Sequence, residues 1–453
     1  MDKVATHASL PSPASTPQPV IYSRSQHPIS RSHISENALK VLYRLKSAGH
    51  EAYLVGGCVR DLLLGREPKD FDVVTNASPE QVRKIFRNSR LVGRRFRLAH
   101  VRFGRDIIEV ATFRGQQDTH KQRQLNEEGR LLCDNVYGTL EQDVWRRDFT
   151  INALYYNIRD FSLVDHVGGM TDLKAGLLRL IGDPEVRYRE DPVRMLRAVR
   201  FAVKLGFTFE TATEQPLTTL APLLRDIPPA RLFDECLKLF LAGSGVQTFE
   251  MLRHYQLFGA LFPDAERILA TEAEGFPRLF IVKGLENSDR RLTEGKTVTA
   301  YFLFAVLLWH VVRQEAEQQE QQGEPAQAAW QNAATRALNR QIRHVALPRR
   351  ITQAMREVWL LQLRFQHRSG QRPYRLLEHP RFRAAYDFLC LRISTEGVDP
   401  KLGQWWETFQ QADEAEQRQM INAHTASRRR TGNNPRRRYR NNRTNQNKRS
   451  HDV

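Results

Sequence analysis

The chain has 453 residues, 41% of them hydrophobic, and it carries a formal net charge of +18. This length exceeds one ordinary core and predicts two to four domains, and the hydrophobic content excludes a mostly disordered protein. The basic surplus predicts an anionic partner, either nucleic acid or an acidic membrane surface. The four cysteines are far apart and form no CxxC pair, which argues against a disulfide framework or a zinc site.

The sequence lacks the patterns typical of export or membrane insertion. The chain does not open with a charged segment followed by an apolar run, so no signal peptide is expected. The longest apolar run, Ala300–Trp309, is too short to span a bilayer and predicts a buried helix. Isolated thiols are typical of a reducing compartment, so a cytoplasmic location is expected.

The first third of the chain predicts an α/β unit behind a leader. Residues 1–30 are rich in Ser, Pro and Thr without apolar periodicity, which predicts a flexible leader. The elements expected next are a helix over 35–48 capped by Ser35, a strand over 51–55, a short helix ending at Gly65 and a strand over 70–74. A capping-box helix beginning at Ser78 follows, with paired strands over 98–103 and 107–113.

The rest of the chain has a different character. Residues 115–130 are polar throughout, which predicts a loop. Helices are then expected over 191–205, 231–242, 247–258, 298–312, 350–366 and within 371–410. From about residue 424 the chain has too few apolar residues for a core. Residues 428–453 carry a charge of +9, which predicts an arm that binds RNA phosphates, with peripheral membrane contact as the alternative.

The segment LVGGCVRDLLLGREPKDFDVVT holds the central pattern of the chain. A predicted strand ends at Gly56 and Gly57, where missing side chains let backbone amides approach an anion, and a helix begins at once. Arg60 lies one turn into that helix, where it is expected to meet a phosphate. Asp70 and Asp72 follow at positions i and i+2 of the next predicted strand, so their carboxylates should converge.

Two converging carboxylates beside a phosphate-binding turn suit Mg²⁺, so Asp70 and Asp72 are the predicted metal ligands. In nucleotidyl transfer such ions lower the pKa of an attacking 3′-hydroxyl and screen the triphosphate. An isolated DxD can also be a solvated strand end, but the glycine turn and Arg60 upstream favour the metal site. Glu109, on the predicted strand 107–113, is either a third acidic group near the metals or an exposed strand residue.

This arrangement, G-G-x-x-R-D followed by D-x-D, resembles the signature of the nucleotidyltransferase superfamily that includes DNA polymerase β. The spacing is similar to that of its class II branch, which contains the bacterial poly(A) polymerases and the CCA-adding tRNA enzymes. The resemblance implies an α+β, polymerase β-like palm domain followed by all-α domains. It places a catalytic domain at 31–165, a helical neck domain at 166–265, a helical RNA-binding region at 266–423 and an Arg-rich disordered tail at 424–453.

A second block, RRDFTIN at residues 146–152, resembles the motif that contacts the nucleotide's sugar and phosphates. The resemblance implies a nucleotide contact for Arg147 and an active-site role for Asp148. An ion pair between Asp148 and a neighbouring arginine is the alternative interpretation.

A third block, at residues 189–201, resembles the motif that reads the base. Asp191 could accept a hydrogen bond from the adenine amino group, and Arg194 could donate one to a ring nitrogen. The same residues are compatible with a capped amphipathic helix that leaves Arg197, Arg200 and Lys204 in solvent.

Two further segments favour the poly(A) polymerases within the class II branch. Residues 91–101 are similar to an element that marks them, and residues 372–383 with the Arg-rich tail are similar to their C-terminal region. The resemblance therefore implies an enzyme that adds AMP from ATP to the 3′ ends of mRNA and other transcripts, with RNA-decay proteins as further partners. A CCA-adding tRNA nucleotidyltransferase and a non-catalytic RNA-binding protein are the alternatives.

Overall fold

The computed structural model describes residues 18–93, 97–115, 136–271 and 276–430. Its contacts divide the chain into two compact units, unit 1 up to Leu220 and unit 2 from Ala221. The domain boundaries predicted from the sequence, at 165, 265 and 423, stay predictions. Most of the predicted polar loop, part of the 91–101 block, the first 17 residues and the tail from 431 lie outside the described residues.

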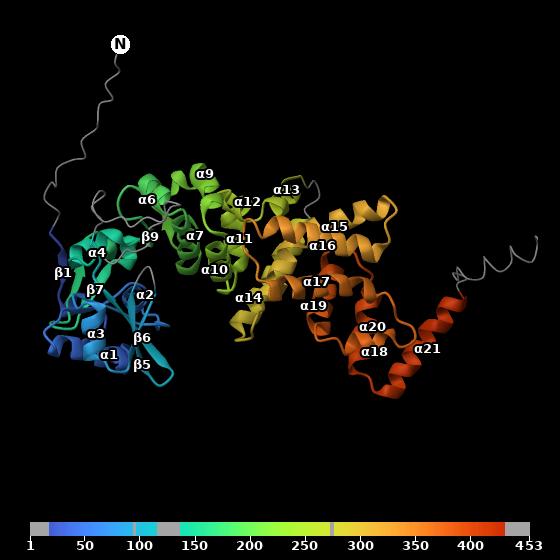
Figure 1. Cartoon of the computed structure of the whole chain (residues 1–453), viewed down its shortest axis with the longest axis horizontal. Coiled ribbons are helices and arrows are strands. Elements are labelled where there is room, and N and C mark those ends of the chain that lie inside the picture. The colour runs from blue at the N-terminus through green and yellow to red at the C-terminus, as the bar shows by residue number, and fades with distance from the viewer. Residues whose placement is uncertain (1–17, 94–96, 116–135, 272–275, 431–453) are drawn as a thin grey trace, which may run out of the picture. The chain divides into compact units, whose positions relative to one another are not determined.

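Unit 1 is built on a mixed sheet, which has eight strands within the described residues, in the order β1-β8-β7-β2-β3-β6-β5-β4 (Figure 1). The strands are β1 Val20–Tyr22, β2 Ala52–Val55, β3 Asp72–Thr75, β4 Ser89–Val92, β5 Leu98–Phe103, β6 Asp106–Thr112, β7 Leu154–Asn157 and β8 Leu163–Asp165. β3 and β6 run parallel, and the other neighbouring strands are antiparallel. The sheet confirms the predicted α+β unit.

Helices α1 (Glu36–Ser47) and α3 (Pro79–Ile85) pack against the sheet. The hydroxyl of Ser35 accepts a hydrogen bond from the Ala38 N–H, as predicted for the cap of the first helix. The predicted capping box is also present at Ser78, where α3 begins. Two short local signals in the sequence therefore fixed the starts of both covering helices.

The predicted leader is too long. Within it, β1 pairs in antiparallel register with β8, and Ile29 is completely buried. The ring of His27 is also buried and forms a 2.9 Å hydrogen bond with the Phe161 carbonyl oxygen. Residues 20–30 therefore belong to unit 1, and the apolar run Val20–Tyr22 was the signal for an edge strand that the Ser- and Pro-rich composition obscured.

The remainder of unit 1 is mostly helical. Its helices are α2 Gly57–Leu63, α4 Leu140–Arg146, α5 Gly169–Ala175, α6 Pro184–Glu190, α7 Val193–Leu205, α8 Thr211–Glu214 and α9 Pro216–Leu220. A 3₁₀ turn, η3 (Thr150–Asn152), leads into β7, and β9 (Leu177–Leu178) pairs in parallel with β10 (Thr208–Phe209). α7 matches the predicted helix to within two residues at its start.

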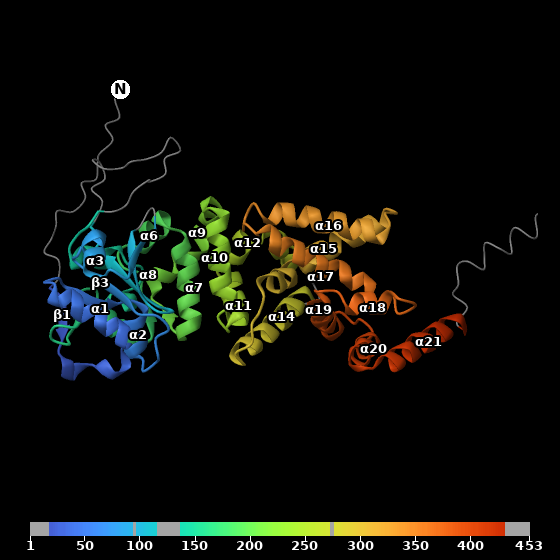
Figure 2. The same ribbon diagram turned by 60° about the horizontal axis from the view of Figure 1, so that its bottom comes forward.

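Unit 2 is all helical within its described residues (Figure 2). Its α-helices are α10 Pro229–Phe240, α11 Gly245–His254, α12 Leu257–Leu261, α13 Pro263–Thr271, α14 Phe276–Thr293, α15 Ala300–Gln321, α16 Ala326–Gln341, α17 Arg349–Arg364, α18 Arg372–Leu377, α19 Phe382–Thr395, α20 Pro400–Gln411 and α21 Glu414–Arg430. Trp359 and Trp406 are fully buried and belong to the core of this unit. α21 continues six residues past the predicted start of the tail at 424.

No helix in the described part of the chain combines the length and apolar character that a membrane span requires. The predicted buried helix at Ala300–Trp309 is part of α15, in which Trp309 is fully buried. The apolar residues of this run therefore contribute to the core of unit 2.

Candidate active site

The glycine turn between β2 and α2 sets the geometry of the site. Gly56 has φ 78° and ψ −135°, a conformation that residues with a Cβ atom rarely adopt. A Cβ atom at this position would lie 3.9 Å from Asp72 Oδ2 and 3.7 Å from Arg147 Nη1. The turn therefore places bare backbone between a carboxylate and a guanidinium, which are the two kinds of charge that a nucleoside triphosphate with its cation would meet.

Asp72 is the first residue of β3, whereas Asp70 precedes the strand. The predicted strand over 70–74 therefore began two residues too early, and the pleat does not explain the pairing of the carboxylates. Asp70 is nevertheless close enough for its charge to act on Asp72, and both side chains are exposed. A loop, rather than strand alternation, brings the two carboxylates together.

The surroundings of Asp72 disfavour its negative charge. Partial burial of the carboxyl is the largest cause, and the negative charges of Glu109 and Asp70 add to it. The positive charge of Arg147 acts in the opposite direction, and the net effect raises the pKa of Asp72 to about 6. The Asp72 side chain is exposed, so solvent partly screens these charges. A divalent cation would reverse it, because it neutralises the surplus of negative charge.

Glu109 lies directly beside Asp72, because the two residues are register partners on the parallel strands β3 and β6. On its other side Glu109 faces His100 of β5, with 3.3 Å between His100 Nε2 and Glu109 Oε1. Of the two interpretations of Glu109, the register favours an acidic group near the carboxylate pair. Whether it binds a metal stays a prediction.

Arg147 is fixed by two partners on its inner side. Its Nε and Nη2 groups donate to Asp143 Oδ2 at 3.2 and 3.0 Å, and Nε also donates to the Tyr155 hydroxyl at 2.8 Å. Burial opposes the positive charge, but Tyr155 and Asp143 more than offset it and raise the pKa of Arg147 above its ordinary value. The Nη1 group of Arg147 lies on the side of Gly56. Asp143 was not predicted from the sequence, although its spacing of four residues from Arg147 at the end of a helix was a usable signal.

Asp148 is held by internal contacts on both oxygens. Oδ1 accepts from the Phe149 N–H at 2.8 Å and from Asn152 Nδ2 at 3.2 Å, and Oδ2 accepts from Arg197 Nε at 2.8 Å. Burial acts against its charge, but Arg197 and these hydrogen bonds hold the pKa of Asp148 below its ordinary value. The ion pair with an arginine, the alternative interpretation of Asp148, is thus present. Arg197, expected in solvent, is that partner.

Arg60 is not placed to bind a phosphate, which corrects the interpretation drawn from the sequence. Its side chain is 2% exposed, and its Nε and Nη2 groups donate to Asp61 Oδ1 at 2.8 and 2.7 Å. Nη1 donates to Asn152 Oδ1 at 2.7 Å. Arg60 therefore joins α2 to η3 and orients Asn152, which in turn contacts Asp148. The position of Arg60 one turn into α2 gave no sign that its side chain points into the protein.

The predicted base-reading residues lie where α6 meets α7. Asp191 follows α6, and its Oδ1 accepts from the Val193 N–H at 3.2 Å. Arg194 Nη1 donates to the Arg187 carbonyl oxygen at 2.6 Å and to Glu190 Oε2 at 3.1 Å. Arg187 also donates to the Arg147 carbonyl oxygen at 2.7 Å, which ties α6 to the residue beside Gly56. Base reading by Asp191 and Arg194 stays a prediction.

The described residues contain no cluster of three or more His, Cys, Asp or Glu side chains arranged to hold a metal ion. Asp70 and Asp72 still fit a divalent cation, because Mg²⁺ is held in such sites by one or two carboxylates and completes its shell with water and substrate phosphates. The excess of negative charge around Asp72 supports that fit.

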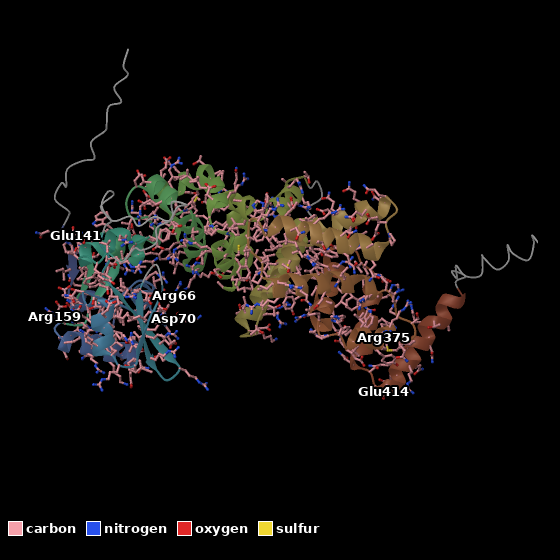
Figure 3. All side chains as sticks on the ribbon, viewed as in Figure 1. Arg66, Asp70, Glu141, Arg159, Arg375 and Glu414 are labelled. Carbon is pink, nitrogen blue, oxygen red and sulfur yellow. The ribbon has the colours of Figure 1, made fainter. Side chains whose placement is uncertain are left out.

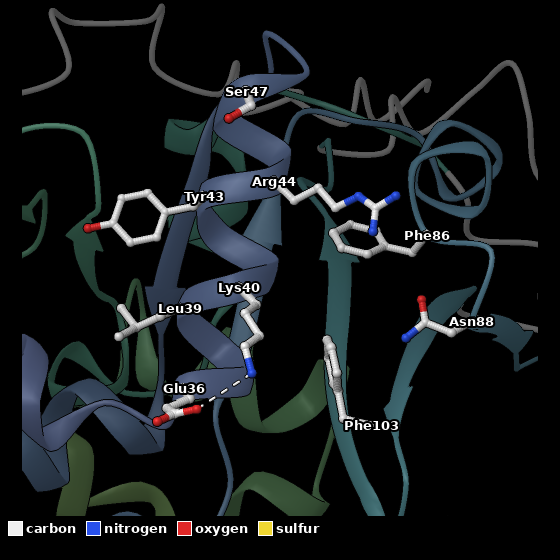
Figure 4. Close-up of a pocket in the computed structure, with 9 residues that line it drawn as sticks. All are labelled: Glu36, Leu39, Lys40, Tyr43, Arg44, Ser47, Phe86, Asn88 and Phe103. Atoms are coloured by element: carbon white, nitrogen blue, oxygen red, sulfur yellow. Dashed lines mark ion pairs between the residues drawn. The ribbon is translucent and has the colours of Figure 1, made fainter.

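A hollow of about 680 Å³ on unit 1 lies away from these residues (Figure 4). It is lined by α1 residues, among them Lys40 and Arg44, together with Phe86 and Phe103. Because side chains alternate along β5, Phe103 faces the opposite side of the sheet from His100 and its partner Glu109. The hollow is therefore not the site of the carboxylates.

Comparisons with known proteins match the chain to three family descriptions. These are the poly A polymerase head domain over residues 52–179, the probable RNA- and SrmB-binding site of polymerase A over 206–269, and the polymerase A arginine-rich C-terminus over 322–444. Poly(A) polymerase I of Salmonella typhi is 52% identical over 90% of this chain and 89% of its own length. The chain belongs to the poly(A) polymerase I family.

A CCA-adding enzyme of Lactobacillus helveticus is a more distant relative, 39% identical over 49% of this chain and 53% of its own length. Among solved structures, the Bacillus stearothermophilus CCA-adding enzyme in complex with CTP is similar at a TM-score of 0.56 and 26% identity, and the match covers 85% of this chain and 82% of that one. These matches confirm the predicted nucleotidyltransferase fold.

Proposed function

We propose that this chain is a polynucleotide adenylyltransferase, which adds AMP from ATP to RNA 3′ ends without a template. The observation that carries the proposal is the 52% identity to a poly(A) polymerase I over nine-tenths of the chain. The site supports it, because Asp70, Asp72 and Glu109 gather beside a turn that only glycine adopts readily. Acidic side chains gathered in this way serve chemistry better than stability.

Asp70 and Asp72 are the residues that would hold the divalent cations of nucleotidyl transfer, with Mg²⁺ as the proposed ion. Such ions, when bound, activate the 3′-hydroxyl and screen the charge of the triphosphate and its leaving group. Glu109 adds negative charge on the same face of the sheet and strengthens the attraction for the ions.

The triphosphate is proposed to lie against Gly56 and Gly57, with the Nη1 edge of Arg147 as its donor. Asp143 and Tyr155 hold this guanidinium in place before substrate binds, so little ordering is left for the complex. Asp148 acts through position: it anchors Arg197 of α7 and thereby the segment that carries Asp191 and Arg194. These two residues are proposed to read the adenine edge.

The test is to incubate the purified protein with Mg²⁺, an unstructured RNA oligonucleotide and each of the four nucleoside triphosphates separately, and to resolve the products on a gel. The proposal predicts long tails with ATP and little extension with CTP. Addition that stops after CCA on a tRNA lacking that end, with no tails on the oligonucleotide, would identify a CCA-adding enzyme instead. Binding of RNA without any extension would identify a non-catalytic protein.

The cellular setting follows from the substrates. The proposed enzyme works in the cytoplasm, where transcripts and ATP meet, and its tails promote RNA turnover together with RNA-decay proteins. The match to a probable RNA-binding site over residues 206–269 supports RNA as the macromolecular partner. Fractionation of cells that express a tagged chain would test the location directly.

A further inference from the structure

Three arginines surround one aromatic ring in unit 1. The guanidinium carbons of Arg60, Arg197 and Arg200 lie 5.3, 5.3 and 4.7 Å from the centre of the Phe201 ring. The first residue comes from α2 and the others from α7, so the two helices meet at this ring. Cations attract the face of an aromatic ring, but three of them also repel one another. The fold therefore concentrates positive charge at this junction.

The positive charges around the ring are partly compensated within unit 1. Arg60 pairs with Asp61, with 2.7 Å between Arg60 Nη2 and Asp61 Oδ1, and Arg197 pairs with Asp148. Two further basic residues extend the positive charge of this junction: Lys204, one turn beyond Arg200 along α7, and Arg66, which follows α2.

The electrostatics of Lys204 show that these groups lie close together. The pKa of Lys204 is lowered by partial burial and by the positive charges of Arg60, Arg200 and Arg66. The negative charge of Asp61 offsets only part of this effect. Asp61 is already bound by Arg60 through two hydrogen bonds. Lys204 and Arg66 are both exposed, so neither is held there by a core. An anion between them would relieve the repulsion that the fold maintains.

The position of this charge connects it to the site. Arg66 lies in the loop that leads to Asp70, and Figure 3 shows both residues in the same part of unit 1. A Cβ atom on Gly57 would lie 3.6 Å from Arg60 Nη2, whereas one on Gly56 would lie 3.9 Å from Asp72 Oδ2. The glycine turn thus has the carboxylate on one side and the start of the basic cluster on the other.

We propose that Arg66, Arg200 and Lys204 form a binding site for a phosphate group beside the carboxylates, supplied by the RNA strand that is extended or by the triphosphate of ATP. The inference deepens the proposed function and rests on it for the identity of these two sources. The three side chains come from one face of α7 and from the adjacent loop, so they can follow a backbone of phosphates without reading bases.

The experiment compares full-length wild-type protein with the double variant Lys204→Ala/Arg66→Ala. A matched control is Lys40→Ala/Arg83→Ala, which removes the same charge from exposed positions on α1 and α3. One arm measures the affinity for a labelled unstructured RNA oligonucleotide against salt concentration, without ATP. The other arm measures KM for ATP at saturating RNA.

If RNA supplies the phosphate, the double variant loses RNA affinity and its slope of log K against log salt becomes shallower by about 1.4. This value is the sum for the two lost contacts, because each contact with a single-strand phosphate contributes about 0.7 to the slope. If the triphosphate supplies it, KM for ATP rises roughly tenfold with RNA affinity unchanged, about the effect of losing one charge-assisted hydrogen bond. Values equal to those of the control in both arms would overturn the proposal.

The two arms also separate this site from the proposed function. RNA affinity is measured without ATP, so a wild-type protein that makes no tails but binds RNA through Lys204 and Arg66 would refute the transferase and keep the site. A wild-type protein that makes tails, with a double variant equal to the control, would refute the site alone. Melting temperatures of all variants should match, because the substituted side chains are exposed.

Discussion

Arg60 donates a 2.7 Å hydrogen bond from Nη1 to Asn152 Oδ1, and so joins the helix after the glycine turn to the 3₁₀ turn that follows Asp148. Asn152 in turn donates to Asp148, which accepts from Arg197 of α7. A short chain of polar contacts therefore runs from the helix behind Gly57 to the helix behind the predicted base-reading residues. Buried networks of this kind position side chains when every member is satisfied.

Replacement of Arg60 by Ala should destabilise unit 1, because Asp61 and Asn152 would lose a buried partner. We expect the free energy of unfolding to fall by about 3 kcal/mol, which is the usual cost of leaving a buried charge unpaired. Chemical denaturation of wild type and variant measures this directly. An unchanged stability with a raised KM for ATP would instead restore Arg60 as a phosphate ligand.

Replacement of Arg197 by Met should destabilise the protein in a pH-dependent way. Because Arg197 lowers the folded-state pKa of Asp148, the pair contributes stability above the ordinary carboxyl pKa of about 3.9 and loses it as pH falls through the lower folded value. The deficit of the variant should therefore be roughly 2 kcal/mol at pH 7 and should shrink below pH 4.

The control for this pH series is Arg189→Met. Arg189 forms an exposed pair with Glu185, with 2.7 Å between Arg189 Nη2 and Glu185 Oε1. Such surface pairs contribute little, so this variant should stay within about 0.5 kcal/mol of wild type at every pH. If the loss of stability in Arg197→Met is the same at pH 7 and at pH 3, the pKa of Asp148 does not depend on Arg197.

The two glycines of the turn should respond differently to Ala. Gly56→Ala should lower the free energy of unfolding by about 1 to 2 kcal/mol, because a Cβ atom strains the backbone at φ 78°. Gly57 opens α2, and an added Cβ meets only Arg60 Nη2 at 3.6 Å, an ordinary contact. Gly57→Ala should therefore be neutral or slightly stabilising in thermal denaturation, and equal losses would contradict this account of the turn.

Much of the site could be predicted because its signals are local. Ser35 and Ser78 mark helix starts, and the two glycines with Asp70 and Asp72 mark the turn and the carboxylates. The direction of a side chain around its helix is a tertiary property, which is why Arg60 was placed toward a phosphate and Arg197 toward solvent. The distant partners of these two arginines, Asn152 in η3 and Asp148 after α4, lie far along the chain.

Other parts depend on pairing between distant segments, which composition alone does not show. The strand β1 is short and sits among Ser and Pro residues, so only its pairing with β8 identifies it. The proximity of Glu109 to Asp72 likewise follows from the parallel register of β3 and β6. Register of this kind is set by the whole sheet rather than by either strand.

The most direct test of the reaction centre is the length of the RNA product made from ATP by wild type, Asp72→Asn and Glu67→Gln, resolved on one gel. Glu67 is exposed in the same loop as Asp70, so its variant removes an equal charge near the site without touching the carboxylate pair. We expect long tails from wild type and Glu67→Gln, and a rate lower by orders of magnitude from a folded Asp72→Asn. Tails of wild-type length from Asp72→Asn would contradict the assignment of Asp70 and Asp72 as the centre of nucleotidyl transfer.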